Sequence, residues 1–277
     1  MSTKSKVWFI TGTSRGFGRI WAEAALSRGD RVAATARNIE TLTPLVDQYG
    51  DLVLPFALDV TDRESAKRAI DAAVAHFGQL DVVINNAGYG LFGMVEEVSE
   101  TQARDQFETN FFGALWVTQA ALPHLRAQGS GHIIQVSSIG GVTAFPFFGI
   151  YNASKWALEG MSQALAAEVK DFGIKVTLVE PMPYATDWSG SSARHAKAIS
   201  DYDRVRDGVL EMFGQVPPGD PVFSVESLLQ LADHEKPPLR LFFGKGGIAS
   251  IGEEYASRLS EWQAWQTSSE RATGAGN

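Results

Sequence analysis

The sequence predicts an α/β fold in which one doubly wound parallel sheet of about seven strands carries helices on both faces. Short apolar runs recur along the chain and end at turns, and longer segments with helical spacing separate them. Because strands that alternate with helices form βαβ units, the runs are expected to pair in parallel. They are KVWFI (6–10), RVAATA (31–36), LVLPFAL (52–58), DVVI (81–84), HIIQV (132–136), KVTLV (175–179) and LRLFF (239–243).

Helical spacing is clearest in GRIWAEAALSRG, TDRESAKRAIDAAVAHFG and ALEGMSQALAAEVKDFG. No linker rich in Pro, Gly or Ser interrupts the chain before residue 180, so residues 1–277 are expected to form a single domain. Residues 181–215 lack a strand-like run and carry aromatic and charged residues, which predicts a substrate-binding loop or helical lid. The tail, from about 268 to 277, is small and polar and is expected to fray.

Composition excludes several classes of protein. The chain has 277 residues, enough to bury a sizeable core, and its formal net charge of −8 argues against nucleic acid as a partner. The absence of cysteine excludes a disulfide scaffold and a thiolate metal site, and no metal is expected. The apolar start of the chain is too short for a signal peptide and no run of 18 apolar residues occurs, so we expect a cytoplasmic protein without a membrane partner.

Three glycines follow the first predicted strand in TGTSRGFGRI and precede a helical segment. Their spacing, G-x-x-x-G-x-G, suits a tight turn that lets the backbone approach a pyrophosphate and aims the amides of a helix N-terminus at it. A turn without a ligand could also carry such glycines, but the position after the first strand favours a dinucleotide site. The expected contacts are Gly12, Thr13, Ser14, Arg15, Gly16, Phe17 and Gly18.

The residues that discriminate between NAD(H) and NADP(H) are expected at the end of the second strand. An acidic residue there would bind the adenosine ribose hydroxyls and repel a 2′-phosphate. The chain instead has Ala36 followed by Arg37, and Arg15 lies within the glycine loop. Two cations without a carboxylate favour NADP(H), although Arg37 could also be a solvated surface residue. We expect NADPH to bind much more tightly than NADH.

Two further turns follow the third and fourth strands. In LDVTD, Asp59 and the adjacent Val60 could contact the adenine, or Asp59 could cap the helix that starts near Thr61 and Asp62. In NNAG (85–88), the first Asn could brace strands, and the backbone after it could lie against a ribose. The expected cofactor contacts in this turn are Asn86, Ala87 and Gly88.

The stretch YNASK puts Tyr151 and Lys155 one helical turn apart. A ketone that accepts a hydride needs a proton on its oxygen, and a phenol can supply it. Matching the phenol to neutral pH requires a downward pKa shift of about three units, or about 4 kcal/mol. The Lys155 ammonium is expected to favour the phenolate, and Ser138, in VSSIGG, would hydrogen-bond the carbonyl. Tyr-x-x-x-Lys alone is a common chance pattern; its combination with the other motifs is not.

In this order, TGTSRGFG, NNAG, Asn110 in TNFFGA, Ser138 and YNASK resemble the short-chain dehydrogenase/reductase family, over residues 6 to 180. The resemblance implies a Rossmann-type domain and a catalytic tetrad of Asn110, Ser138, Tyr151 and Lys155. Tyr151 would be the acid/base, Lys155 would also bind the nicotinamide ribose, and Asn110 would hold a water that links Lys155 to solvent. Asn110 could otherwise be a polar residue that bonds a neighbouring backbone. Similarity to ketone and hydroxysteroid-type reductases adds weight to NADP(H) and implies a homodimer or homotetramer.

The expected substrate walls are mostly apolar, and no cluster of Lys or Arg marks an anionic substrate. This favours a bulky uncharged ketone or secondary alcohol, although half of these residues could fill the core or an interface. A non-catalytic NADP(H) sensor is the main alternative; an epimerase or dehydratase acting on sugar nucleotides would need a larger C-terminal region. The walls are Tyr89, Leu91, Phe92, Ser138, Ile139, Phe145, Phe147, Phe148, Met182, Tyr184 and Trp188.

One position departs from the family pattern, which usually has Pro-Gly after the sixth strand. Here Pro181 precedes Met182, while Thr186 still matches the position that bonds the nicotinamide carboxamide. A thioether thus replaces a hydrogen near the expected nicotinamide. We hypothesise that Met182 narrows or re-aims the substrate site. The Met182→Gly variant should then rank a panel of ketones differently from the parent, and an unchanged ranking of kcat/KM would count against the hypothesis.

Overall fold

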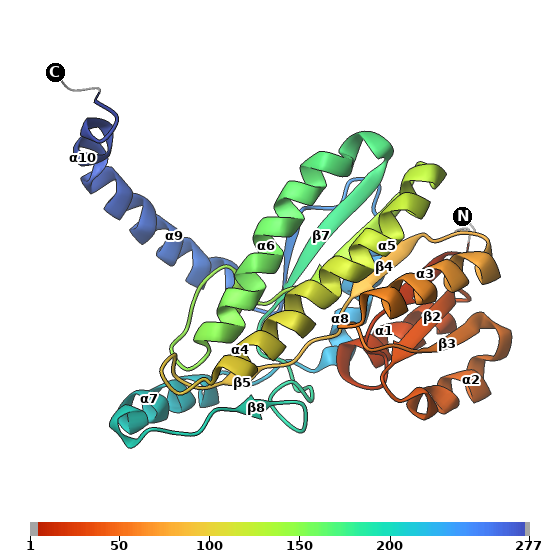
Figure 1. Cartoon of the computed structure of the whole chain (residues 1–277), viewed down its shortest axis with the longest axis horizontal. Helices are drawn as coiled ribbons and strands as arrows, with labels where there is room; N and C mark the ends of the chain where they lie inside the picture. Colours follow the sequence, from red (N-terminus) through yellow and green to blue (C-terminus); the bar gives the residue numbers. More distant parts are fainter. Residues whose placement is uncertain (1–4, 275–277) are drawn as a thin grey trace.

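A seven-stranded, all-parallel sheet in the order β3-β2-β1-β4-β6-β7-β9 runs through the protein (Figure 1). The structure is a computed structural model and describes residues 5–274. Every apolar run predicted as a strand belongs to this sheet, so the predicted fold class is confirmed. The strands are β1 (Val7–Ile10), β2 (Arg31–Ala36), β3 (Val53–Ala57), β4 (Val82–Asn85), β6 (Gly131–Val136), β7 (Ile174–Pro181) and β9 (Arg240–Phe243).

Helices cover both faces of the sheet, and the period of two along β1 explains how. Val7 and Phe9 point to one face, where they pack with residues of α3 (Arg63–Phe77), α5 (Gly113–Gln128) and α6 (Gly149–Val169). Trp8 and Ile10 point to the other, where they pack with residues of α1 (Gly16–Ser27), α2 (Thr43–Tyr49) and α8 (Ser224–Asp233). Both faces are therefore buried, as the continuous apolar runs require.

Strand order reverses beside β1, whose neighbours are β2 on one side and β4 on the other. In sheets of this kind, ligands bind outside the carboxyl ends of the strands at such a switch point. The turns after β1, β2, β3, β4 and β6 all open on that edge, so topology brings the sequence motifs together.

The start of α3 excludes one of the two readings of Asp59. Asp62 is the capping residue, because its carboxylate accepts a hydrogen bond from the Ser65 amide at 3.0 Å. Asp59 instead accepts from the amide and hydroxyl of Thr61, at 3.0 and 2.8 Å. The reading of Asp59 as the helix cap is therefore wrong.

The segment 181–215 differs from its prediction in one respect. It holds α7 (Asp203–Gly214), as expected of a helical lid, but also the two-residue strand β8 (Arg194–His195). This strand pairs in parallel with β5 (Leu91–Phe92) in a separate small sheet. The expectation that the segment lacks a strand is wrong, since two residues are too few to show a period-two pattern.

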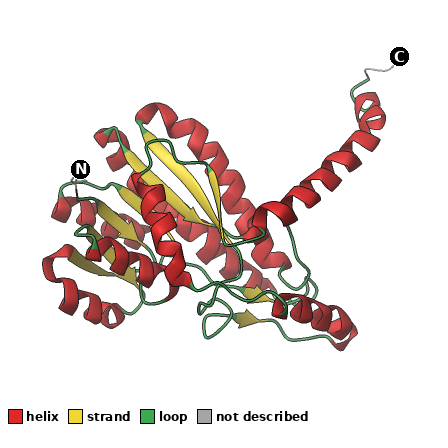
Figure 2. Cartoon of the chain, turned by 180° about the vertical axis from the view of Figure 1, so that it is seen from behind, coloured by secondary structure: helices red, strands yellow, loops and turns green. Residues whose placement is uncertain are grey.

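The C-terminal helices α9 (Gly247–Ala264) and α10 (Gln266–Arg271) extend away from the sheet, as both ribbon views show (Figures 1 and 2). Large apolar side chains on this arm are exposed, among them Tyr255, Leu259, Trp262 and Trp265.

Residues 268–274 of the predicted frayed tail are exposed, whereas 275–277, like residues 1–4 at the N-terminus, lie outside the described residues. α4 (Glu100–Phe107) completes the set of α-helices, and none in the described range is long and apolar enough to cross a bilayer.

Candidate active site

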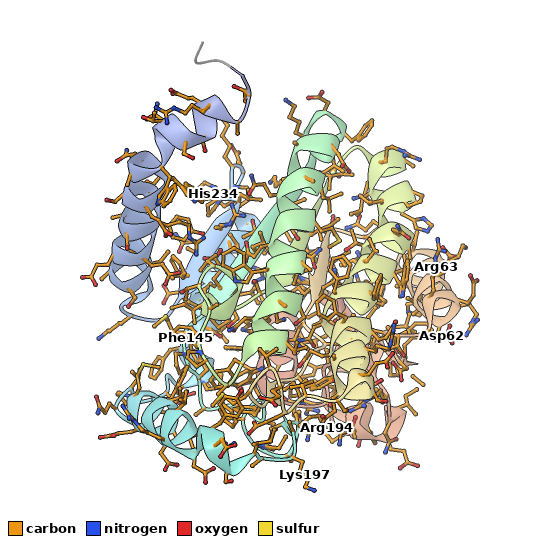
Figure 3. The ribbon with its side chains drawn as sticks, turned by 60° about the vertical axis from the view of Figure 1, so that its left-hand side comes forward. Asp62, Arg63, Phe145, Arg194, Lys197 and His234 are labelled. Carbon is orange, nitrogen blue, oxygen red and sulfur yellow. The ribbon has the colours of Figure 1, made fainter. Side chains whose placement is uncertain are left out.

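A single cavity of about 1410 Å³ collects most of the predicted site residues at the carboxyl edge of the sheet. Figure 3 shows Phe145 and Arg194, which line it, near α7 and at the end of the molecule opposite His234. Four predicted site residues, Thr13, Gly18, Asn110 and Phe147, do not line it. The predicted residues that do are Gly12, Ser14, Arg15, Gly16, Phe17, Arg37, Asp59, Val60, Asn86, Ala87, Gly88, Tyr89, Leu91, Phe92, Ser138, Ile139, Phe145, Phe148, Tyr151, Lys155, Pro181, Met182, Tyr184, Thr186 and Trp188.

The glycine loop forms one end of this cavity. Gly12 and Gly16 have φ angles of +70° and +57°, which L side chains rarely adopt. Gly18 is required by packing: a β-carbon there would lie 2.3 Å from the Gly12 carbonyl oxygen and 2.5 Å from Asn86 Nδ2. The start of α1 has no capping side chain and no acidic residue in its first turn among the described residues. Its amides therefore face the cavity as an anion-binding end, which suits the pyrophosphate of a dinucleotide.

The cations expected to choose the cofactor differ in their surroundings. Arg37 is exposed, lines the cavity and follows the buried Ala36 at the end of β2. Arg15 donates a hydrogen bond to Ser191 Oγ at 2.8 Å, and its Nε lies 3.9 Å from the Asp187 carboxylate. Arg15 is thus partly engaged with the loop after β7, so Arg37 is the cation left at the end of β2.

The NNAG turn is braced from both sides. Asn85 donates to Gln135 on β6 and to Thr118 on α5, both at 2.9 Å, as expected of a residue that braces strands. Asn86 donates through Nδ2 to the carbonyls of Thr11 and Gly12, at 2.9 and 3.2 Å. Its side-chain amide therefore holds the glycine loop in place, and Ala87 and Gly88 line the cavity.

The four predicted catalytic residues lie together. Tyr151 and Lys155 are 5% and 6% exposed on α6, with Lys155 Nζ 5.9 Å from the centre of the Tyr151 ring. Lys155 donates to the Val136 carbonyl at 2.8 Å. Ser138 lies on the loop after β6, and both its hydroxyl and the Tyr151 ring contact the β-carbon position of Gly140, at 3.5 and 3.4 Å.

Asn110 lies in a π-helical turn, Glu108–Phe112, of the kind often found at functional sites. Its Nδ2 donates to the Tyr89 carbonyl at 3.0 Å, and its Oδ1 accepts from the Tyr89 amide at 3.1 Å. A β-carbon on Gly88 would lie 3.1 Å from Asn110 Oδ1 and 3.7 Å from Lys155 Nζ. Asn110 therefore fixes the backbone beside Lys155, and its role in holding a water stays a prediction.

The direction of the Tyr151 pKa shift corrects the sequence-based expectation. Burial raises the pKa of Tyr151 to about 12, and the neighbouring Ser138 hydroxyl and Trp188 indole offset this only in part. Burial also lowers the pKa of Lys155 to about 8, although the carboxylate of Glu159 acts to raise it. The expected fall in the phenol pKa is wrong for the protein groups alone, because removing the phenolate from water outweighs a cation that is directed at Val136.

Aromatic side chains form the other end of the cavity. The Trp188 ring lies 5.0 Å from that of Tyr151 and 5.2 Å from that of Phe92, centre to centre. Its indole Nε1 is buried and has no hydrogen-bond partner among the described residues, and Gly90 leaves the room that the indole needs. Phe147, predicted as a wall, packs in the core cluster beneath instead of lining the cavity.

Met182 lies on the cavity wall but packs toward the turn after β9. A β-carbon on Gly244 would lie 2.8 Å from Met182 Cβ, and one on Gly247 would lie 3.4 Å from its Sδ. Thr186 faces the glycine loop, 3.8 Å from the β-carbon position of Gly16. The loop after β7 thus closes over the cavity between its two ends.

Comparison with known proteins identifies the family. A family model described as short chain dehydrogenase matches residues 6–197. The chain belongs to the short-chain dehydrogenase family. It is 42% identical over 261 residues to "Oxidoreductase BOA17" of Botryotinia fuckeliana (strain B05.10), covering 93% of each chain.

Solved structures agree with this assignment. A short-chain dehydrogenase from Streptomyces avermitilis superposes with a TM-score of 0.91 at 39% identity, covering 98% of this chain and 100% of the other. The structure of ElxO with NADP bound superposes with a TM-score of 0.76 at 26% identity, covering 89% and 100%. The protein is therefore a dehydrogenase or reductase with the fold and the family that its motifs predicted.

Several cavity residues of this short-chain dehydrogenase carry no motif. Gln102 and Asp105 reach the cavity from α4, and Leu210 and Phe213 reach it from α7. The spacing of Leu210 and Phe213, one turn apart, is the only signal in the sequence that could have found them. Within the part of the chain that the structure describes, no three His, Asp or Glu side chains gather to hold a metal ion.

Gly18→Ala should lower the free energy of unfolding by about 2 kcal/mol, because the added methyl meets the Gly12 carbonyl, a backbone group that cannot turn aside. Chemical denaturation measures the change. The matched control is Gly160→Ala, since nothing lies within 4 Å of its β-carbon position on α6, and there Ala should be neutral or stabilising. Equal stabilities for the two variants would contradict the packing argument.

Proposed function

We propose that this short-chain dehydrogenase uses NADP(H) to reduce a bulky, largely apolar ketone to a secondary alcohol, or to run the reverse reaction, as carbonyl reductases and alcohol dehydrogenases do. The observation that carries the proposal is the shared cavity. One end is the glycine loop with the α1 amides, and the other is an aromatic pocket that holds Tyr151, Ser138 and Lys155. A dinucleotide and an apolar substrate would therefore meet at the Tyr151 phenol.

The residues present fit such a cofactor. The α1 amides would hold its pyrophosphate, Arg37 its 2′-phosphate, Asp59 its adenine, and Lys155 and Thr186 its nicotinamide end. NADPH, when bound, supplies the hydride. The preference for NADP(H) rests on Arg37 and on Ala36, which stands where an acidic residue would repel a phosphate; the NADP-bound structure of ElxO supports a nicotinamide cofactor in this fold.

Tyr151 suits the role of proton donor in the reductive direction. Because burial raises the pKa of Tyr151 to about 12, the phenol is protonated at neutral pH and can give its proton to the substrate oxygen. The neighbouring Ser138 hydroxyl, Trp188 indole and Lys155 ammonium would then stabilise the phenolate that remains. The ketone carbon gains the hydride, the oxygen gains the Tyr151 proton, and solvent returns a proton to Tyr151.

The aromatic walls determine the proposed substrate class. Phe92, Phe148 and Trp188 pack edge to face or in stacks around Tyr151, which leaves an apolar surface for a large hydrocarbon or aromatic group.

We also propose a homodimer or homotetramer in the cytoplasm. The exposed apolar side chains of α9 support an oligomer, and the mass in solution by light scattering tests it.

Tyr151→Phe should abolish ketone-dependent oxidation of NADPH, lowering kcat by about 10² or more, because it removes only the proton donor. Binding of NADPH and the melting temperature should stay close to those of the parent. A panel of aromatic ketones with absorbance detection measures turnover, and fluorescence titration measures binding. A parent protein that binds NADPH and oxidises none of it would favour the alternative, a non-catalytic NADP(H) sensor.

Arg37→Ala should weaken NADPH binding by about tenfold or more and leave NADH binding unchanged, because one charge-assisted hydrogen bond to the 2′-phosphate is lost. Dissociation constants for both nucleotides, measured by fluorescence, test this. The control is Arg68→Ala, an exposed arginine on α3 that does not line the cavity. Equal losses for NADPH and NADH would show that Arg37 does not read the phosphate.

A further inference from the structure

Two buried carboxyl groups lie outside the cavity, and one of them is a helical turn away from the predicted catalytic lysine. Glu159 follows Lys155 by one turn of α6, and Glu180 lies near the end of β7. Their side chains are 6% and 1% exposed, and neither lines the cavity. A buried carboxylate needs several hydrogen-bond donors, so the donors around this pair decide its charge.

Arg240, on β9, is the cation that faces both groups. Its Nε lies 2.9 Å from Glu159 Oε2 and 3.5 Å from Glu180 Oε1, while its Nη2 donates to Gln163. Among the described residues, Glu159 Oε1 and both oxygens of Glu180 have no hydrogen-bond partner. One guanidinium nitrogen cannot satisfy two buried carboxylates, which would also repel each other.

The pair is connected to the active site at Gly141. A β-carbon there would lie 2.5 Å from Ser137 Oγ, 3.2 Å from Glu159 Cγ and 3.3 Å from Lys155 Cβ. Three buried side chains thus converge on one glycine, three residues after Ser138. The charge on Glu159 acts directly on Lys155, because the carboxylate opposes the effect of burial on the pKa of the ammonium.

We propose that Glu159 and Glu180 share one proton and act as positioning residues for Lys155, with Glu159 as the ionised counter-charge and Glu180 as the protonated partner. The shared proton supplies a hydrogen-bond donor to carboxyl oxygens that lack one among the described residues, and it leaves one negative charge for Lys155 and Arg240. The proposal rests on the proposed function, in which the Lys155 ammonium assists Tyr151.

The ionisation of each group agrees with this arrangement. Burial and the neighbouring Glu159 raise the pKa of Glu180 to about 8, although Arg240 acts to lower it. Burial also raises the pKa of Glu159, although Ser137, Arg240 and Lys155 act to lower it. Arg240 from β9 faces both carboxyl groups, whereas Lys155 from α6 and Ser137 from the loop after β6 face Glu159. Above about pH 8 the second carboxyl ionises and the arrangement is lost.

The sign of the effect on stability follows. The pKa of Glu180 is higher in the folded protein than its ordinary value of 4.5, so the folded state binds more protons than the unfolded state between about pH 4.5 and 8. Stability is therefore lost as the pH rises through this window. Glu180→Gln keeps the shape, cannot ionise and should remove the loss.

The test compares the parent, Glu180→Gln and Glu168→Gln, a control at an exposed position on the same helix. In the parent, infrared spectroscopy should detect a protonated carboxyl band that disappears with a midpoint near pH 8. The band should persist in the control and be absent from Glu180→Gln. Between about pH 5 and 8, the unfolding equilibrium constant of the parent should rise about tenfold or more relative to that of Glu180→Gln. A parent without the band, or a band retained in Glu180→Gln, overturns the proposal.

The pH profile of turnover separates a positioning role from a merely structural one. Glu159→Gln should move the alkaline limb of the kcat profile to lower pH, because the ammonium of Lys155 loses its counter-charge. Glu180→Gln should remove one ionisation from that limb. Unchanged profiles in both variants overturn the link to Lys155. If the parent shows the titrating band but no turnover with any ketone, the proposed function fails and the shared proton stands.

Discussion

Burial of Tyr151 and Lys155 side by side is the constraint on which the rest of the site depends. Both side chains ionise in water, and both are almost completely removed from it. Taking a charge out of water is costly unless partners replace the solvent, so each group requires its own partners. Lys155 donates to the Val136 carbonyl, and the Glu159 carboxylate favours its charged form. The Ser138 hydroxyl and the Trp188 indole favour the phenolate of Tyr151, but less than burial opposes it. The opposite pKa shifts of the two groups follow from the same desolvation.

The surrounding backbone is fixed by side chains that never reach the cavity. Asn85 ties β4 to α5 and β6, and Asn110 holds the Tyr89 backbone through both its amide atoms. Glu159, Glu180 and Arg240 perform the same task with charge on the other side of α6. Tyr151 and Lys155 therefore sit on a helix held from two sides, which gives a site the geometric precision that proton transfer requires.

The sequence was informative where a local pattern and the topology agree. Seven apolar runs became seven strands because each is long enough to show its pattern, and the motifs met because parallel strands end at one edge. Two-residue strands such as β8 carry no such pattern, and Asp59 and Asp62 fit a helix cap equally well until the geometry shows which accepts from Ser65. The sequence could not show the direction of the Tyr151 pKa shift, because it depends on how burial competes with Ser138 and Trp188.

The position of Met182 connects the cavity to the C-terminal arm. Its side chain reaches the turn after β9, where Gly244, with a φ of +107°, leaves the space for it, and its sulfur lies 3.4 Å from the β-carbon position of Gly247, the first residue of α9. Along α9, Arg258 lies over the Trp156 ring at 5.2 Å, and Glu254 accepts a hydrogen bond from Thr143, on the loop between Ser138 and Tyr151. The arm is thus anchored to the cavity wall and to the loop that precedes the phenol. A change at Met182 acts on both the wall and this anchor, so its influence on substrate choice would pass through the loops around Tyr151 as well as through the space left by the thioether.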